Sequence, residues 1–267
     1  MPVRRVVEHG ALRRRARRRR VLWSGAEVLV TAGVLVLLLV VHQLWWTNRE
    51  ARQGAERQVE ALERQWGTTT TGDDPSDADA ESSSDADSGA GPADRSDSGS
   101  AATRPSDSAQ QSTTPRPSRA YAVLAVPRLR LRVPVAEGTS KRNVLNKGYV
   151  GHYTGTQQPG EAGNFALAGH RNTHGEPFRY LNRLRPKDTV EVETAEATYT
   201  YVVDRVLPQT SPRDSGVIRP VPRSLSHPSY GYDAPGRYLT LTTCTPEYTS
   251  RYRLVVWGKL TSTRPRG

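Results

Sequence analysis

A long apolar segment near the N-terminus places the strongest limit on how this chain can fold. Residues 21–46 are mostly apolar, and Leu29–Val41 is almost wholly aliphatic. About 20 such residues in a helix cross the ~30 Å hydrocarbon core of a bilayer. Trp23 and the pair Trp45–Trp46 lie at the two ends, where interfacial aromatic residues are common. The sequence therefore predicts a transmembrane helix over residues 21–46.

Positive charge before this segment predicts its orientation. The tail over residues 1–20 contains nine Arg, and basic residues stay on the cytoplasmic side, so everything after Trp46 should lie outside the cell. A cleaved signal peptide would need a small-x-small site, and Gln43–Thr47 offers none. An Arg run also suits nucleic acid, but its position against an apolar span argues against nucleic-acid binding. We expect a retained, single-pass cell-membrane anchor with a cytoplasmic N-terminus.

Two segments of different composition follow the span. Residues 47–67 predict a helix with a narrow apolar stripe at Val59, Leu62 and Trp66, either a short juxtamembrane coil or an extension of the span. Residues 68–118 contain no Val, Ile, Leu, Phe, Tyr or Trp, so we expect a disordered linker. A flexible linker of about 50 residues has a root-mean-square reach of roughly 40 Å. It would hold the following domain away from the membrane.

The remaining residues, 119–262, predict one all-β domain. Short β-branched or aromatic-rich runs alternate with Pro and Gly clusters, which is typical of strands and turns. About seven strands within ~140 residues favour a closed or nearly closed barrel. Pro177–Leu184 is the one segment that predicts a helix, because Phe178, Leu181 and Leu184 share a face. The predicted strands are Tyr121–Val126, Leu131–Val135, Asn164–Ala168, Thr189–Glu193, Thr198–Leu207, Tyr238–Thr243 and Tyr252–Lys259.

The chain has one cysteine, Cys244. A single cysteine excludes an intramolecular disulfide and any multi-cysteine metal site. It is either a small buried apolar residue or a reactive thiol. Cys244 directly follows a predicted strand, His170 lies just beyond the end of another, and Arg253 lies at the start of the last strand, nine residues after Cys244. A nearby His or Arg cation would stabilise the thiolate, and Arg253 with a backbone N–H would suit the oxyanion of acyl transfer.

Composition alone does not single out His170 as the base. Three other histidines, His152, His174 and His227, remain open for that role. Tyr149 and Tyr153, which precede the His170 strand, suit either a substrate groove or the core. We also predict that Thr242 and Thr243, beside the cysteine, contact substrate.

These segments resemble the sortase family. Thr240–Cys244 reads TLTTC, which is similar to the family's TLxTC signature, and Gly169–Arg171 resembles its strand-end GHR. The resemblance implies an eight-stranded sortase β-barrel with one or two short helices, with Cys244 as nucleophile, His170 as acid/base and Arg253 as oxyanion or substrate stabiliser. It also implies cleavage of a Thr–Gly bond in a C-terminal sorting signal through a thioester, which an amine on a cell-wall precursor of the lipid II kind then resolves.

The subclass and the rival functions lead to different expectations. The chain looks most like class E sortases of high-GC Gram-positive bacteria, on the segments Gly151–Tyr153, Pro159–Glu161 and Cys244–Tyr248. That resemblance implies a preference for an LAxTG sorting motif over an LPxTG-like one. A class D-like enzyme is the alternative. An L,D-transpeptidase would need an SHGC-type run, and a papain-like peptidase would place Cys upstream of His. A non-catalytic wall-binding module would bury the thiol. We expect no cofactor or metal, and secreted proteins with a sorting signal as partners.

Overall fold

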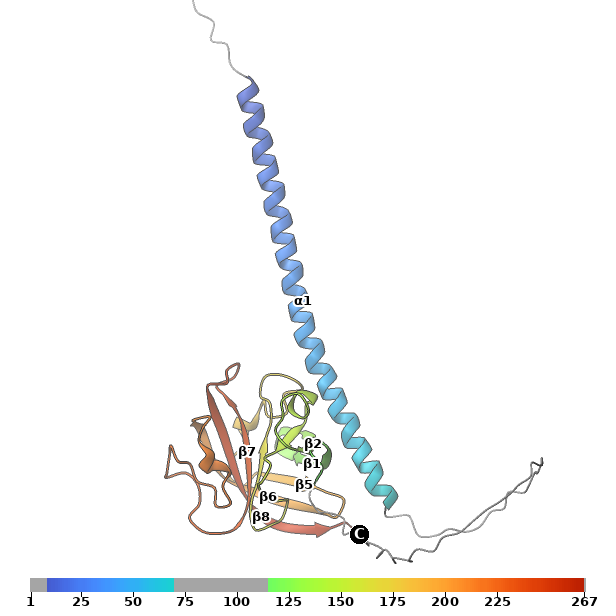
Figure 1. Ribbon diagram of the computed structural model, residues 1–267, viewed down its shortest axis with the longest axis vertical. Coiled ribbons are helices and arrows are strands. Elements are labelled where there is room, and N and C mark those ends of the chain that lie inside the picture. Colours follow the sequence, from blue (N-terminus) through green and yellow to red (C-terminus); the bar gives the residue numbers. More distant parts are fainter. Residues whose placement is uncertain (1–8, 70–114, 267) are drawn as a thin grey trace, which may run out of the picture.

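The computed structural model describes residues 9–69 and 115–266, which form one long helix and one β-barrel (Figure 1). The helix α1 (His9–Thr69) is continuous, so residues 47–67 extend the span. Most of the linker expected to be disordered, residues 70–114, and the first part of the tail, residues 1–8, lie outside the described residues.

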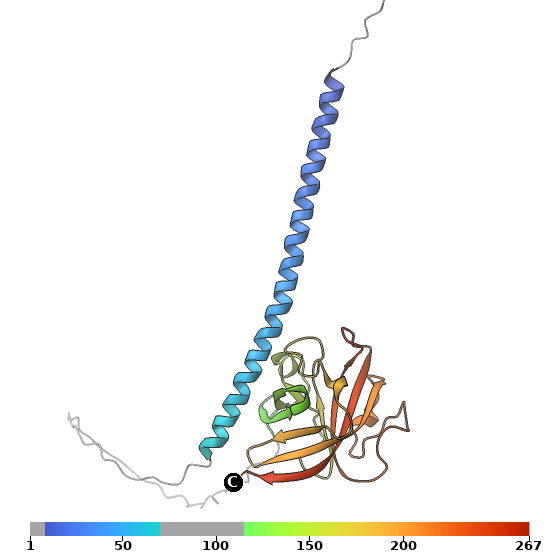
Figure 2. The ribbon, with the colours of Figure 1, turned by 180° about the vertical axis from the view of Figure 1, so that it is seen from behind.

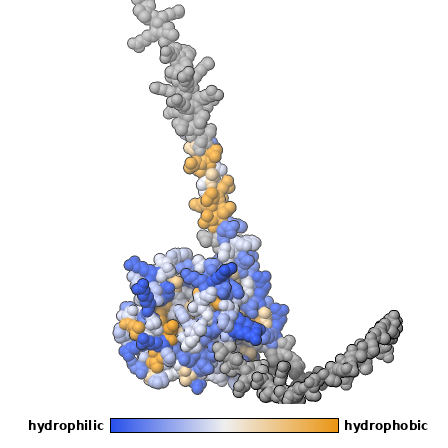
Figure 3. Space-filling model, viewed as in Figure 1, coloured by the Kyte–Doolittle hydropathy of each residue, from blue (hydrophilic) through white to orange (hydrophobic). Residues whose placement is uncertain are grey.

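The first part of α1 presents apolar side chains to the outside. Large exposed apolar residues run from Val28 to Trp46, visible as an orange band above the barrel in Figure 3. In the described chain, one helix, within Ala26–Gly67, is long and apolar enough to cross a membrane. Exposed aliphatic surface of this extent fits a lipid environment.

The second part of α1 packs against the barrel. The predicted stripe of Val59, Leu62 and Trp66 is buried, and Ala51 and Ala55 continue it toward the membrane span. The stripe lies on the first two strands and the loop that follows them, where its partners are Ala120, Val123, Ala136, Val144, Leu145 and Tyr149. Seen from both sides, the barrel lies alongside α1 (Figures 1 and 2). The barrel therefore packs on the extension of the predicted span, a contact not predicted from the sequence.

Eight strands close into a barrel in the order β1-β2-β3-β4-β7-β8-β6-β5, which confirms the predicted fold class. The pairs β2/β3 and β4/β7 are parallel, and the other neighbours are antiparallel. The strands are β1 (Ala120–Val126), β2 (Leu131–Glu137), β3 (Val150–His152), β4 (Gly163–Ala168), β5 (Thr189–Glu193), β6 (Ala197–Thr210), β7 (Arg237–Thr245) and β8 (Tyr252–Pro265).

Alternation along the strands divides the barrel into an inner core and an outer face. Leu239 and Leu241 of β7 point into the main core, as do Phe165 and Leu167 of β4. On the outside of β7 and β8, the connection between β6 and β7 covers a second cluster. Trp257 belongs to that cluster and donates from Nε1 to the Val217 carbonyl at 3.2 Å. Both faces of β7 are therefore packed along most of the strand.

One sequence prediction of local structure is wrong, and one strand was not predicted. Segment Pro177–Leu184 is not an α-helix: it contains the 3₁₀ turn η3 (Leu181–Arg183), although Phe178, Leu181 and Leu184 are buried as expected. The chain is already extended at Leu184, and Pro186 disfavours a helical conformation at Arg185, so the turn does not continue. Strand β3 escaped prediction because three residues are too short to show alternation. The other 3₁₀ turns are η1 (Pro127–Leu129), η2 (Leu145–Lys147) and η4 (Ser215–Ile218).

The central position of β7 predicts a large cost for truncating its inward side chains. Leu241 is 0% exposed, so Leu241→Ala should lower the free energy of unfolding by ~2–5 kcal/mol through lost transfer energy and a cavity. Urea unfolding of the detergent-solubilised chain, followed by Trp fluorescence, measures this. Leu225→Ala, at a residue that is 54% exposed, is the matched control. A loss at Leu241 no larger than at Leu225 would contradict the packing described.

Candidate active site

Three neighbouring strands bring Cys244, His170 and Arg253 to the same end of the barrel. Strand β7 lies between β4 and β8. In the antiparallel pair, Cys244 lies directly opposite Arg253, so their side chains share a face with Cβ atoms ~4.5–5.5 Å apart. In the parallel pair, Ala168 is level with Thr242, and His170 follows Ala168 by the same two residues that separate Thr242 from Cys244. The three residues therefore form a row across neighbouring strands, with Cys244 in the middle between His170 and Arg253.

The thiol lies on the outer face of the barrel, beyond the part of β7 that the connection between β6 and β7 covers. Thr240 and Thr242 alternate with the inward Leu239 and Leu241, and this alternation places Cys244 on the outer face. The hydroxyl of Thr240 lies under the connection between β6 and β7, donating to the Val217 carbonyl at 3.2 Å. Cys244 is only partly buried. A free, accessible thiol argues against the reading of this cysteine as a small buried apolar residue.

The loop after β4 is fastened to the end of β7. The Thr243 hydroxyl donates to the Gly169 carbonyl at 2.8 Å. Arg171 donates from Nη1 to the Cys244 carbonyl at 3.2 Å and to Thr245 Oγ1 at 2.9 Å. A side chain at Gly169 would meet the Phe178 ring at 2.7 Å, so only glycine fits this turn. These contacts fix the backbone that carries His170 relative to the backbone that carries the thiol.

His170 is held by a neighbouring amide and kept neutral. Its Nε2 lies 3.0 Å from Asn146 Oδ1; because that oxygen only accepts, Nε2 carries the proton and Nδ1 is the acceptor. The ring stacks on His174 at 5.4 Å between centroids. Burial, followed by the nearby His174 and Lys141, lowers the pKa of His170 to about 4. At neutral pH the resident cation near the thiol is therefore Arg253, not His170.

The guanidinium of Arg253 is anchored by the backbone next to it. Its Nη1 donates to the carbonyls of Ser250 and Tyr252 at 2.9 and 3.0 Å. Arginine has five N–H donors in a planar fork. Within the described chain, the hydrogen bonds of the Arg253 guanidinium use only Nη1. The remaining donors are available to an oxygen placed between Arg253 and Cys244.

The structure places Thr242 and Thr243, the predicted substrate contacts, within the barrel wall. Both are 3% exposed. Thr242 donates to the Leu167 carbonyl and lies 3.1 Å from the Tyr153 hydroxyl, and Thr243 is bound to Gly169 as described. Their hydroxyls join β7 to β4, so they position the cysteine from within the barrel wall.

The other histidines and Tyr149 lie in different settings. His152 is 1% exposed and binds Glu137 Oε2 at 2.7 Å and Thr156 Oγ1 at 2.9 Å, so it belongs to the barrel interior. His227 packs on Tyr230 in the connection between β6 and β7. Tyr149 packs against α1. Of the histidines left open by composition, His174 is the one that contacts His170.

Sequence reasoning missed two residues that position the site. Asn146 lies in η2, 24 residues before His170, and no local pattern connects the two. Arg171 was visible within the GHR motif, but only the fold shows that it reaches the end of β7. In the described ranges 9–69 and 115–266, no three His, Cys, Asp or Glu side chains gather closely enough to hold a metal ion.

The structure is thus a closed β-barrel that carries a thiol, an imidazole and a guanidinium at one end, which is the arrangement expected of a cysteine-dependent enzyme. The sequence model of the sortase domain matches residues 124–261. Sortase SrtE2 of Streptomyces coelicolor is 34% identical over 243 residues, which cover 89% of this chain and 81% of SrtE2. The chain belongs to the sortase family.

Class E sortases are prominent among the relatives, which confirms the predicted resemblance. Sortase SrtE1 of Streptomyces coelicolor is 40% identical over 245 residues, covering 90% of this chain; the match spans 57% of the length of SrtE1. A crystal structure of sortase E1 from that organism, with a tripeptide in its active site, superposes with a TM-score of 0.53 and 51% identity, over 57% of this chain and 94% of that one. Sortase E from Streptomyces avermitilis gives 0.50 and 43%, over 56% and 93%.

The environment of His170 predicts an unusual titration. Its imidazole should titrate with a midpoint near pH 4 in the native chain, against the ordinary value of 6.5. Because the unfolded imidazole then binds more protons between these values, the stability of the protein should fall as the pH drops from about 6.5 to about 4. NMR of ring-labelled histidine, assigned with His170→Asn, measures the midpoint. A midpoint close to 6.5 would contradict the burial of this ring.

Proposed function

We propose that this chain is a cysteine transpeptidase that cleaves a C-terminal sorting signal and transfers the released protein to an amine of the cell wall. The observation that carries the proposal is the row of His170, Cys244 and Arg253 across β4, β7 and β8. Sortases are transpeptidases of this kind, and the related sortase E1 binds a tripeptide in its active site.

The first half-reaction forms a thioester. Cys244 Sγ attacks the carbonyl carbon of the scissile peptide bond while His170 Nδ1 takes the thiol proton. Arg253 and a backbone N–H near Cys244 stabilise the oxyanion. The C–N bond then breaks, and the imidazolium returns its proton to the leaving amine. A pKa of about 4 makes that imidazolium a strong acid, which favours the protonation of a poor leaving group.

The second half-reaction repeats these steps in reverse. An incoming amine attacks the thioester carbonyl, loses a proton to His170 and forms a new amide bond, and the C–S bond breaks to restore the thiol. Asn146, which accepts from Nε2, keeps the proton on that nitrogen so that Nδ1 stays ready as base.

The proposed substrates follow from the class. The likeness to class E enzymes favours secreted proteins with an LAxTG-like signal, cut between Thr and Gly, over the LPxTG form, and a lipid II-like amine as acceptor. A class D-like motif is the alternative, supported by a match of 33% identity over 86 residues to sortase D of Bacillus subtilis. The apolar helix and the sortase domain fit a membrane-anchored protein, and we propose a cytoplasmic N-terminus with the barrel outside.

Variants at the row of site residues test this function. Cys244→Ala should abolish cleavage of LAxTG and LPxTG peptides in the presence of an amine, and Arg253→Ala should reduce turnover by ~10²-fold or more through loss of oxyanion stabilisation. Mass spectrometry follows product and the thioester, which adds the acyl fragment to Cys244. Arg264→Ala, at the other end of β8, is the matched control. Full activity of Cys244→Ala would remove Cys244 as the nucleophile, and the absence of cleavage and thioester with every peptide would favour a non-catalytic wall-binding module.

The single cysteine also tests the proposed orientation. A membrane-impermeant maleimide added to intact protoplasts should label Cys244, which is the one thiol in the chain and is partly exposed. A permeant maleimide on the same cells and the Cys244→Ser variant are the controls. Labelling by the permeant reagent alone would place the barrel inside the cell.

A further inference from the structure

The surface between α1 and the barrel does more than join the anchor to the domain. The apolar stripe from Ala51 to Trp66 packs on β1, β2 and η2. Polar contacts follow it: Tyr149 lies 3.5 Å from Gln58, and Arg132 pairs with Glu63. We define residues 48–66 of α1 as the docking segment.

The barrel carries a residue that suits this helix. Gly148 follows η2 with φ near +80°, and a Cβ atom there would lie 2.8 Å from the Ala51 carbonyl oxygen of α1. A side chain at this position would push the helix backbone away. Glycine meets both demands, a left-handed backbone and a close approach. The dock is thus encoded in the barrel as well as in the helix.

The docked barrel has a defined direction along α1. Near the span, the Asn48 side chain accepts from the Gly175 N–H at 2.6 Å and Arg52 donates to the Gly175 carbonyl at 3.0 Å. At the far end, Arg266 stacks over Trp66 at 4.6 Å. Gly175 lies in the loop that begins with His170. The active-site end of the barrel therefore points toward the span, where the β7–β8 turn is seen in Figures 1 and 2.

Helix geometry gives the height of this end above the bilayer. The exposed apolar surface of α1 ends at Trp46. At ~1.5 Å per residue, Asn48 and Arg52 lie ~3 and ~9 Å farther along the axis, and Trp66 ~30 Å. The loop that carries His170 is thus held about 10 Å beyond the end of the apolar span.

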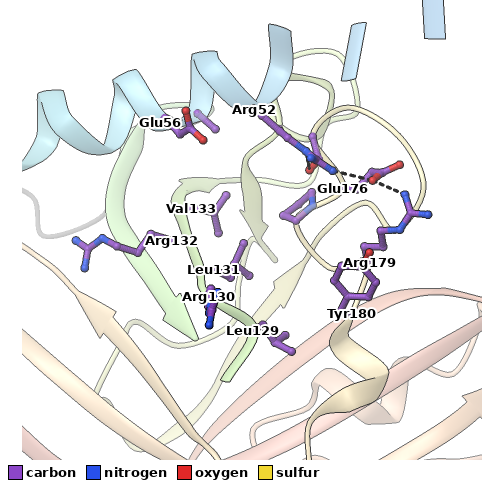
Figure 4. Close-up of a pocket in the computed structure, with 14 residues that line it drawn as sticks. Arg52, Glu56, Leu129, Arg130, Leu131, Arg132, Val133, Glu176, Arg179 and Tyr180 are labelled. Atoms are coloured by element: carbon purple, nitrogen blue, oxygen red, sulfur yellow. Dashed lines mark hydrogen bonds and ion pairs between the residues drawn. The ribbon is translucent and has the colours of Figure 1, made fainter. Parts of the chain in front are cut away.

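A chain of ion pairs extends from the docking segment into the active-site loops. Glu176 accepts from Arg52 at 2.9 Å and from Arg179 at 2.6 Å beside a cavity of about 270 Å³ between α1 and the barrel (Figure 4). Arg179 reaches Glu247 and the Tyr248 hydroxyl, each at 3.1 Å, in the turn that follows Cys244. The Glu176 side chain is 6% exposed, so its charge depends on both arginines.

We propose that the docking segment holds the active site facing the outer membrane surface, so that the enzyme selects peptide segments within ~10–20 Å of that surface, given the helix rise above. This inference rests on the proposed function and topology. A barrel free on the predicted linker would instead sample heights up to roughly 40 Å and show little such selection.

Spacer-dependent cleavage by the full chain in vesicles tests the proposal. Membrane-anchored LAxTG peptides carry spacers of about 3 or about 25 residues between motif and anchor, ~10 Å and up to ~80 Å when extended. Leu62→Asp breaks the dock at a residue that is 5% exposed, and Ala61→Asp places the same charge on the exposed side of α1. We expect wild type and Ala61→Asp to favour the short spacer by about tenfold or more, and Leu62→Asp to lose this preference.

A soluble LAxTG peptide and an optical distance separate the possible failures. Cleavage of the soluble peptide should be equal in all three proteins; its loss in Leu62→Asp alone would overturn the proposal in favour of a structural role for α1. Energy transfer from a dye on Cys244 to headgroup-labelled lipid reports height without any catalysis, and we expect a loss of transfer in Leu62→Asp alone. Equal spacer ratios, or equal transfer, in Leu62→Asp and wild type would overturn the proposal. If no protein cleaves any peptide while transfer differs as expected, the proposed function fails and the orientation stands.

Discussion

The parallel pairing of β4 with β7 is the constraint on which the chemistry of this protein depends. Parallel strands run in the same direction, so their C-terminal ends meet at one edge. That pairing brings His170 beside Cys244, although they lie 74 residues apart in the sequence. The antiparallel β8 then returns Arg253 to the same edge. Because β7 has one parallel and one antiparallel neighbour, Cys244 near its end lies between the proposed base and a cation.

The site combines a neutral base with a permanent cation. Desolvation lowers the pKa of His170, and arginine keeps its charge at every physiological pH. In the proposed mechanism, His170 activates the thiol and becomes charged only when it takes the thiol proton, whereas Arg253 stabilises the oxyanion with a charge that it carries throughout. The same desolvation that weakens the imidazole as a resting base strengthens the imidazolium as an acid, which suits a reaction whose leaving group is an amine.

Most strands and the proposed site residues could be predicted from the sequence, but the short elements and the long-range contacts could not. Alternation and β-branched residues were enough for seven strands, while β3, with three residues, left no periodic signal. The stripe at Phe178, Leu181 and Leu184 correctly predicted burial, yet the segment forms one 3₁₀ turn that ends where Leu184 becomes extended. The position of Cys244 at the end of a strand could be predicted, because the strand before it has a clear pattern. The role of Asn146 could not, because its contact with His170 exists only after the barrel has closed.

The docking of α1 shows how a stripe of side chains can be predicted while its partner is not. Val59, Leu62 and Trp66 signal an apolar face, and helical periodicity cannot say whether that face meets another helix, lipid or a sheet. The barrel supplies the answer through Gly148, whose missing side chain leaves space for the Ala51 carbonyl. Separating helix from barrel would remove Arg52 from Glu176 but would leave the pair with Arg179, which lies three residues farther along the same segment. The helix therefore orients the barrel as a unit, through its close approach at Gly148 and its contacts with the loop that carries His170, while that loop keeps an internal ion pair of its own.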